Sequence, residues 1–159
     1  MQTVSESPDA FASITIAAPA LTLYGMVTDV ARMGEWSPEA TGASSVPEHL
    51  EVGSVFQGHN SRGPVRWTTT CTVRTAEPGV EFSFDVDSGP FPLSRWSYTF
   101  EETAAGTIVS ERWWDRRDGV QGLAIKLGGQ MLIPGSRAEH NAGTMRTTLA
   151  QLKRAAEAA

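Results

Sequence analysis

The side chain best placed to do chemistry is Glu111, a carboxylate that stands among aromatic residues in the sequence. A hairpin that turns at residues 104–105 would set Glu111 directly opposite Tyr98. Trp96 and Trp113 would then form the next pair on the same face. A carboxyl group among wide apolar rings loses hydration, which raises its pKa and fits it for proton transfer near neutral pH. The alternatives are a structural ion pair, a hydrogen bond to Tyr98, or a place near the sheet end that water reaches.

Other polar side chains are weaker candidates, and each has a structural alternative. Tyr98 could donate a hydrogen bond to a ligand carbonyl, or it could only satisfy a neighbour. Asn141 falls on the apolar stripe of a predicted helix, where a polar group needs a partner, whereas turn capping competes with ligand contact at Asn60. Cys71 has no evident neighbouring base and is interpreted as a small buried hydrophobe. His59 falls on the outward side of its strand, so we expect it at the surface.

Several common chemistries lack their residues in this chain. The three histidines, at positions 49, 59 and 140, show no HxH or HExxH spacing, and there is a single cysteine, so a zinc site is not expected. No GxxxxGK[ST] loop and no GxSxG elbow occurs, which disfavours a nucleotide enzyme or a serine hydrolase. The sequence therefore implies no metal and no redox cofactor.

The composition is that of a globular protein of one domain. The chain has 159 residues, with 40% hydrophobic and 19% charged residues, which is enough for a core and a cavity. The net charge is −5 without any Lys/Arg run, so nucleic acid and stable membrane association are poor expectations. The single cysteine, and the lack of a signal peptide or an 18-residue apolar run, predict a cytoplasmic protein. We expect a monomer or homodimer.

The elements that must position Glu111 are read from hydrophobic spacing and turn residues. Residues 1–10 are polar and predicted to be flexible, and residues 11–158 are predicted to form one ligand-binding domain. A short helix should follow Pro19, and a long amphipathic helix should run from about Pro134 to Ala156. The predicted strands are Phe11 to Ala17, Val52 to Asn60, Val65 to Ala76, Val80 to Val86, Leu93 to Glu101 and Thr107 to Asp115.

Three turns set the expected register, and register decides which side chains share a face. The expected pairs are Asn60 with Val65, Gly58 with Trp67, Phe56 with Thr69, Val73 with Phe84, Cys71 with Val86, Phe100 with Val109, Tyr98 with Glu111, and Trp96 with Trp113. In all three hairpins the bulky apolar side chains then meet on one side. The opposite, solvated face would carry Arg66, Arg74, Glu81, Asp85, Arg95, Arg112 and Arg116.

The apolar face is lined by wide aromatics with polar residues between them, where a plain core would have Val, Ile and Leu. That composition suits a ligand cavity better than a solid core. The predicted ligand-contacting residues are Phe56, Asn60, Trp67, Thr69, Cys71, Phe82, Phe84, Trp96, Trp113, Asn141 and Met145.

Several segments of the sequence resemble those of a known family. The segments VTDVARMGEWSPEATG, VGSVFQGHNSRGPVRWTTTCTV, PGVEFSFDV, SRWSYTFEE and GTMRTTLAQLKRAAEA are similar to the actinobacterial polyketide cyclase/dehydrase-like branch of the SRPBCC superfamily, which includes the START lipid-transfer domains. The resemblance implies an α+β helix-grip fold. A curved antiparallel sheet of six or seven strands would wrap around the C-terminal helix, with short helices after the first strand. The segment Gly119 to Gly135 would form part of a gate to the cavity.

The resemblance leaves two functions open. The first is an enzyme of the cyclase/dehydrase type acting on a hydrophobic, polyketide-like carbonyl substrate without metal or redox cofactor. Glu111 would shuttle protons for aldol closure or water loss, and Tyr98 or Asn141 would polarise a carbonyl. The second is a non-catalytic carrier or sensor of a lipid-like or aromatic ligand, in which Glu111 only satisfies a polar group of the ligand.

Overall fold

The structure, a computed structural model, describes residues 7–117 and 137–158, so the predicted gate segment lies outside the described residues. The element order is β1 (Ala10–Ile16), α1 (Ala20–Thr28), the 3-10 helix η1 (Val30–Glu35), β2 (Ala40–Ser44), β3 (Val55–Arg62), β4 (Val65–Glu77), β5 (Glu81–Ser88), β6 (Phe91–Thr103), β7 (Gly106–Asp115) and α3 (Arg137–Ala158).

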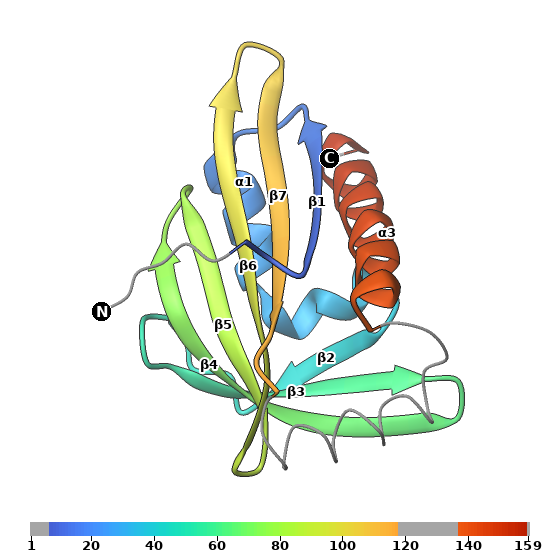
Figure 1. Cartoon of the computed structure of the whole chain (residues 1–159). Helices are drawn as coiled ribbons and strands as arrows, with labels where there is room; N and C mark the ends of the chain where they lie inside the picture. The colour runs from blue at the N-terminus through green and yellow to red at the C-terminus, as the bar shows by residue number, and fades with distance from the viewer. Residues whose placement is uncertain (1–6, 118–136, 159) are drawn as a thin grey trace.

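The strands form one antiparallel sheet in the order β1-β7-β6-β5-β4-β3-β2. The sheet curls, and α3 lies along β1 and β7 while α1 lies behind β5 and β6 (Figure 1). Both helices cover the face that carries the aromatic side chains, since Tyr24 of α1 packs edge-on against Phe82 and Phe100. The predicted α+β helix-grip fold is confirmed, with seven strands.

The sequence did not single out the seventh strand, β2. Its residues, ATGAS, are small and polar, and a bulge between Ala40 and Gly42 interrupts the pairing with β3. A short edge strand buries little and so lacks the alternation from which strands are predicted. It matters for the site, because it pairs with β3 and packs against η1.

The first hairpin was predicted with the wrong partners but with the right facing. A two-residue turn at Gly63-Pro64 pairs Asn60 with Trp67, so the expected pair of Asn60 with Val65 is wrong by two residues. Gly58 likewise pairs with Thr69 and Phe56 with Cys71. Because side chains alternate with a period of two along a strand, a slip of two residues leaves every side chain on its predicted face.

The middle hairpin has the predicted pairs for a reason that the sequence did not reveal. Val80 N–H donates to Glu77 O at 2.9 Å and Gly79 has a φ of +75°, as the expected type II turn requires. The turn holds one residue more than predicted, since Glu77 pairs with Glu81. A bulge between Val73 and Thr75 adds a residue to β4 and compensates. The pairs of Val73 with Phe84 and Cys71 with Val86 are therefore confirmed.

The last hairpin follows the prediction at every position named, with Phe100 opposite Val109, Tyr98 opposite Glu111, and Trp96 opposite Trp113. Its two-residue turn at 104–105 leaves one way to pair the strands. Gly106, which ends that turn, has no room for a side chain, because a Cβ atom would lie 2.5 Å from Ile16 O.

Helix α3 is anchored to β1 at its C-terminal end. The Glu157 carboxylate accepts a hydrogen bond from Ala17 N–H, and Lys153 Nζ donates to Thr15 O, each at 2.8 Å. Helix α3 packs against β1, whose buried residues include the small Ala10 and Ala12. The helix ends at Ala158, two residues beyond the expected end, while its predicted start at Pro134 lies outside the described residues.

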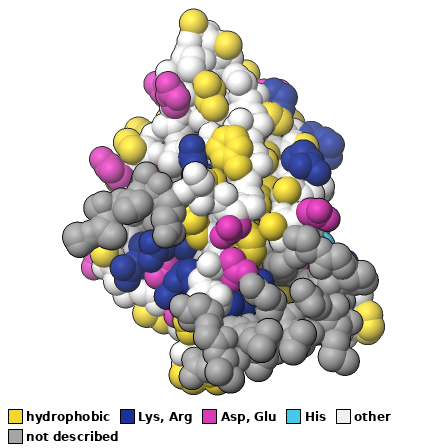
Figure 2. Space-filling view, in the orientation of Figure 1, with side chains coloured by type: hydrophobic (Ala, Val, Ile, Leu, Met, Phe, Trp, Pro, Cys, Tyr) yellow, Lys and Arg dark blue, Asp and Glu magenta, His cyan; other side chains and the backbone are white. Residues whose placement is uncertain are grey.

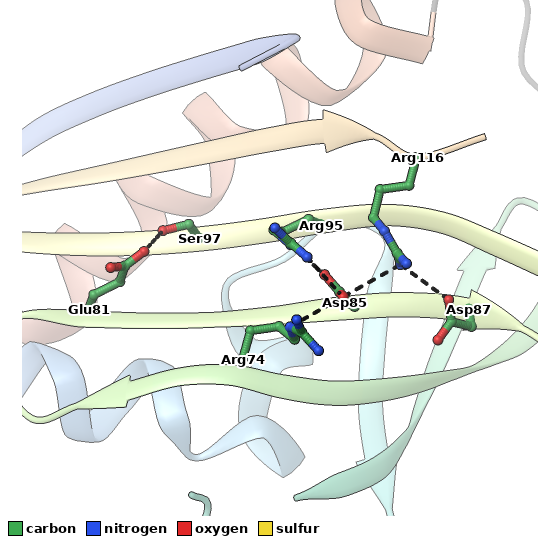
Figure 3. Close-up of polar contacts among 7 residues, drawn as sticks. All are labelled: Arg74, Glu81, Asp85, Asp87, Arg95, Ser97 and Arg116. Atoms are coloured by element: carbon green, nitrogen blue, oxygen red, sulfur yellow. Dashed lines mark hydrogen bonds and ion pairs between the residues drawn. The ribbon is translucent and has the colours of Figure 1, made fainter. Parts of the chain in front are cut away.

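The outer face of the sheet carries charges, as predicted, but one of them is buried. Asp85 has 8% of its side chain exposed and forms a two-bond ion pair with Arg95. Arg95 Nε donates to Oδ1 at 2.6 Å and Nη2 donates to Oδ2 at 3.1 Å. Arg74 and Arg116 approach the same carboxylate at 3.5 and 3.8 Å (Figure 3). Positive and negative side chains lie next to each other on this face (Figure 2). This network belongs to the side of the sheet opposite the aromatic residues.

Candidate functional site

A cavity of about 690 Å³ lies on the inner face of the sheet, bounded by the strands, by η1 and by α3. That volume falls within the usual range for small-molecule sites. Of the predicted site residues, ten line it: Phe56, Asn60, Trp67, Thr69, Cys71, Phe84, Trp96, Tyr98, Glu111 and Trp113. They come from β3, β4, β5, β6 and β7, and they share one face because the three hairpins keep the predicted facing.

Three predicted contact residues are placed next to the cavity and not on its wall. Phe82 is fully buried, with its ring 6.3 Å from that of Tyr24 and 5.6 Å from that of Phe84, so it packs behind the aromatic wall. Met145 and Asn141 are 0% and 1% exposed on the buried side of α3. Ligand contact by these three residues stays a prediction.

Sequence reasoning missed the part of the wall that comes from outside the hairpins. Val30 and Met33 of η1, Ala40 and Ala43 of β2, and Ala138, Thr144 and Thr148 of α3 also line the cavity. The threonines carried a signal, since they are four residues apart and flank the apolar stripe of the helix. For η1 and β2 the sequence offered no comparable signal, because only the tertiary fold brings them across β3.

Glu111 and Tyr98 form the buried polar pair of the site. They face each other on β7 and β6 and are 2% and 5% exposed. Burial raises the pKa of Glu111 to about 8, while a side-chain hydrogen bond from Tyr98 works in the opposite direction. Burial, and then the charge on Glu111, raises the pKa of Tyr98 well above its usual value. At neutral pH the pair therefore holds a carboxylic acid and a phenol, with the acid able to release its proton near pH 8.

Two buried side chains of this region have polar atoms without a partner in the part of the chain that the structure describes. They are Glu111, through Oε1, and Asn141, through both Oδ1 and Nδ2. Asn141 lies on α3 one turn before Thr144 and Met145, next to the wall. Buried polar atoms normally have a hydrogen-bond partner, so these three mark places where a ligand could supply one.

Charged residues surround one end of the cavity. Arg62, at the end of β3, donates through Nη1 to His140 Nδ1 at 2.9 Å, and His140 Nε2 lies 3.2 Å from Glu39 Oε2. Because a guanidinium has no acceptor, one ring nitrogen of His140 must accept from Arg62, whose Nη1 also lies 3.2 Å from Nε2. Arg117 makes a two-bond ion pair with Asp115, at 2.8 Å for each bond. All but His140 line the cavity, so its rim is polar while its body is aromatic.

Cys71 has the surroundings expected for a non-catalytic residue, whereas His59 lies nearer to the cavity than expected. Cys71 is 4% exposed, and burial raises the pKa of its thiol to about 11, so it is protonated at neutral pH. Gly58 leaves room for it, since a Cβ atom there would lie 3.3 Å from Cys71 Sγ. His59, expected at the surface, is half-buried at the cavity edge, where its ring contacts Ser44 Oγ and Thr68 Oγ1 at 2.8 and 3.3 Å.

Two further observations concern the described residues only. Residues 7–117 and 137–158 contain no group of three or more His, Cys, Asp or Glu side chains arranged to hold a metal ion. Among the helices formed by these residues, none is both long and apolar enough to cross a membrane.

The comparisons with known proteins agree with this architecture. A family model described as polyketide cyclase / dehydrase and lipid transport matches residues 1–157. The polyketide cyclase-like protein Cgl2372 from Corynebacterium glutamicum has a solved structure with 30% sequence identity and a TM-score of 0.58, covering 92% of this chain and 90% of that chain. No curated protein sequence matches the chain.

More distant structures share the fold alone. Protein Ms6760 from Mycobacterium smegmatis is 17% identical, with a TM-score of 0.62, covering 99% of this chain and 98% of that chain. The di-domain ARO/CYC StfQ from the steffimycin biosynthetic pathway is 18% identical, with a TM-score of 0.62, and the match covers 92% of this chain but 44% of StfQ. With a family model that spans nearly all residues and a relative at 30% identity, the chain belongs to the polyketide cyclase/dehydrase and lipid transport family.

Proposed function

We propose that this protein binds a hydrophobic, carbonyl-bearing small molecule in its cavity and catalyses its cyclisation or dehydration. The observation that carries the proposal is the Glu111–Tyr98 pair, a proton-bearing acid and a phenol buried in an aromatic wall. An acid whose pKa lies near the working pH is suited to give and take protons during one reaction. The membership of the family supports the same reading.

The chemistry needs no co-reactant. In an aldol closure, a proton leaves the carbon next to one carbonyl, that carbon forms a bond to the carbon of a second carbonyl, and the oxygen of the second carbonyl takes up a proton. In the following dehydration, a further α-proton and the new hydroxyl leave together as water. Glu111 would protonate the carbonyl or hydroxyl oxygen and, once ionised, remove the α-proton, while Tyr98 supports the acid by hydrogen bonding.

The cavity would also contribute by holding a flexible chain in a folded shape, which lowers the entropy cost of ring closure. Aromatic walls from five strands, including Phe56, Trp67 and Trp96, give large contact areas without fixing hydrogen-bond geometry. The polar rim at Arg62 and Arg117 would keep the polar end of a ligand near solvent.

A carrier or sensor is the second candidate, and the description of the family, which includes lipid transport, favours it. In that case the aromatic wall alone supplies affinity, and Glu111 pairs with a polar atom of the ligand without changing it. The same site then has no reaction to lose when the acid is replaced.

Two measurements separate these candidates. Prodan, a fluorescent naphthyl ketone, should bind to wild type with a blue-shifted emission and with quenching of tryptophan fluorescence. An aryl-substituted 1,5-diketone tests chemistry, because aldol closure and water loss convert it to a cyclohexenone with a new ultraviolet absorption. We expect wild type to accelerate this conversion, and Glu111→Gln to bind prodan equally well but lose at least about tenfold in rate, within the usual contribution of a general acid. Prodan binding without any acceleration would favour the carrier.

A further inference from the structure

We infer that the ligand places a hydrogen-bond acceptor, the carbonyl oxygen of an uncharged group, against Oε1 of Glu111. The inference rests on the proposed function in one respect, namely that the cavity holds a small molecule. It goes further by naming the atom that recognises the ligand and the polarity that the ligand must have. The observations are the unpartnered Oε1, the bond from Tyr98 and the position of Glu111 on the cavity wall.

The position of the acid proton follows from the hydrogen bonds. The Tyr98 hydroxyl has one proton, and it hydrogen-bonds the Glu111 carboxyl. A neutral carboxylic acid has one carbonyl oxygen, which is the better acceptor, and one hydroxyl oxygen, which is the donor. This hydrogen bond lowers the pKa of Glu111 and raises that of Tyr98, so Tyr98 is the donor. Tyr98 therefore takes the carbonyl oxygen, and the proton of the acid lies on the other oxygen. That other oxygen is Oε1, the one without a partner in the described chain.

A buried hydroxyl donor without an acceptor is costly. A ligand carbonyl removes that cost, whereas an apolar ligand of the same shape leaves it in place. A ligand ammonium group would direct a donor at a donor, and a ligand carboxylate would bring a charge into an aromatic cavity, which is unfavourable. A ligand hydroxyl can accept through its oxygen, but it brings a proton of its own that needs a further acceptor in the aromatic wall. The site therefore selects neutral ketones, aldehydes, quinones or esters.

The groups around Glu111 do not change this reading. Tyr98 on β6 is the one titratable side chain named among the causes of its shifted pKa. On β1 the neighbour of Glu111 is Ala12, and further along β7 Asp115 is already paired with Arg117. The next inward-facing residue of β7 is Trp113, which is uncharged.

On the opposite wall, α3 contributes hydroxyl groups. Lys153 of α3 contacts Thr15 of β1, which sets the level of the helix against the strand. A helix rises about 1.5 Å per residue and a strand about 3.3 Å, so five residues along α3 span about the same length as two residues along β1. Thr148 thus lies near the level of Ser13, which is next to Ala12, the partner of Glu111. Thr148 and Thr144 are the uncharged polar residues that the described part of α3 presents to the cavity.

The test uses two probes of the same shape. 2-Acetonaphthone carries a carbonyl, and 2-isopropenylnaphthalene has a CH₂ group in place of that oxygen. The measured quantity is the ratio of their dissociation constants, from tryptophan quenching at pH 6 and pH 9.5. Glu111→Leu gives the ratio without any hydrogen bond. We expect wild type at pH 6 to favour the ketone about fivefold more than Glu111→Leu does, as for one net hydrogen bond of about 1 kcal/mol.

The pH and a second variant identify the donor. Above its pKa of about 8, Glu111 loses the proton, so the ketone preference of wild type should fall to that of Glu111→Leu at pH 9.5. Glu111→Gln places an amide N–H donor at the same position, so its preference should remain at both pH values. This variant is the matched control, since it keeps shape and donor but cannot titrate.

The outcomes are distinct. Two results would overturn the inference without contradicting ligand binding in the cavity. One is an equal ratio for wild type and Glu111→Leu at pH 6. The other is a ketone preference of wild type that persists or grows at pH 9.5. If neither probe binds to wild type, the proposed function itself fails. Loss of preference in wild type at pH 9.5 together with retention in Glu111→Gln supports the assignment of the donor to Oε1.

Discussion

Tyr98 and Glu111 stand directly opposite each other on β6 and β7, and both side chains are almost completely buried at the wall of the cavity. Burial raises the pKa of both groups, and the hydrogen bond between them holds back the rise at Glu111. Two protonated groups in contact with an aromatic cavity are a means of moving a proton, and they also make the protein sensitive to pH.

The first prediction concerns stability against pH. The pKa of Glu111 is about 8 in the folded protein and near 4.5 when exposed, so the folded state binds the extra proton between these values. The contribution of this group to the free energy of unfolding should therefore be highest below about pH 4.5. It should fall between about pH 4.5 and 8, by at most about 1.4 kcal/mol per pH unit, and level off above pH 8. Urea denaturation across pH 5 to 9 measures it, with Glu111→Gln as the control that removes this slope. A Glu111→Gln profile parallel to wild type would contradict the raised pKa.

The second prediction concerns Asn141, whose amide is 1% exposed with both polar atoms unpartnered in the described chain. Replacement by Leu keeps the branched arrangement of heavy atoms and removes two unsatisfied groups, so Asn141→Leu should raise the free energy of unfolding by about 1–3 kcal/mol without ligand. Chemical denaturation of the two proteins measures the difference. Destabilisation by a similar amount would show that the amide is paired in solution and is a structural group. Stabilisation together with weaker prodan binding would identify it as a ligand contact.

The third prediction separates the two faces of the sheet. Asp85→Asn removes the charge that three arginines share on the outer face, and it should lower the free energy of unfolding by about 1–3 kcal/mol. Arg74→Ala is the matched control, because that side chain is 54% exposed and 3.5 Å from the carboxylate, so its loss should cost less than about 1 kcal/mol. Prodan affinity should be unchanged in both variants. Altered prodan binding would mean that the outer network shapes the cavity.

The fourth prediction concerns the thiol of Cys71. Alkylation requires the thiolate, and burial raises the pKa of this thiol to about 11, so iodoacetamide should react slowly at pH 7.5 with the native protein and rapidly with the urea-unfolded protein. Since Cys71 lines the cavity, bound prodan should slow the reaction further. Mass spectrometry follows the modification, with Cys71→Ser as the blank. Native labelling as fast as that of the unfolded chain would show that the cavity wall is open at β4.

The quality of the sequence prediction varied with the turn that closed each hairpin. The two-residue turn after β6 leaves one register, so the facing of Tyr98 and Glu111 was predicted correctly. At β3–β4 the chosen partners were wrong by two residues, and the facing survived because side chains alternate with a period of two. At β4–β5 a longer turn and a bulge cancelled each other, and neither leaves a periodic signal in the sequence.

The parts of the site that the sequence did not reveal come from elements with little pattern of their own. Strand β2 is short and polar, and the contacts of Met33 and Ala43 with the cavity exist only because the chain folds back across β3. Phe82 could not be distinguished from Phe84 by facing, since both point inward. The difference is that Tyr24 of α1 covers Phe82, whereas Phe84 faces the cavity.

The family, the antiparallel hairpins and the face to which Glu111 belongs could be predicted from the sequence, because they depend on alternation and turn chemistry, which are local. The tertiary structure decided which inward-facing side chains border empty space and which are packed, and it decided that Glu111 is buried deeply enough to stay protonated at neutral pH. Burial and the pKa depend on what the helices and distant strands bring to the same volume. No alternation along one segment contains that information, since desolvation is set by neighbours that are far apart in the chain.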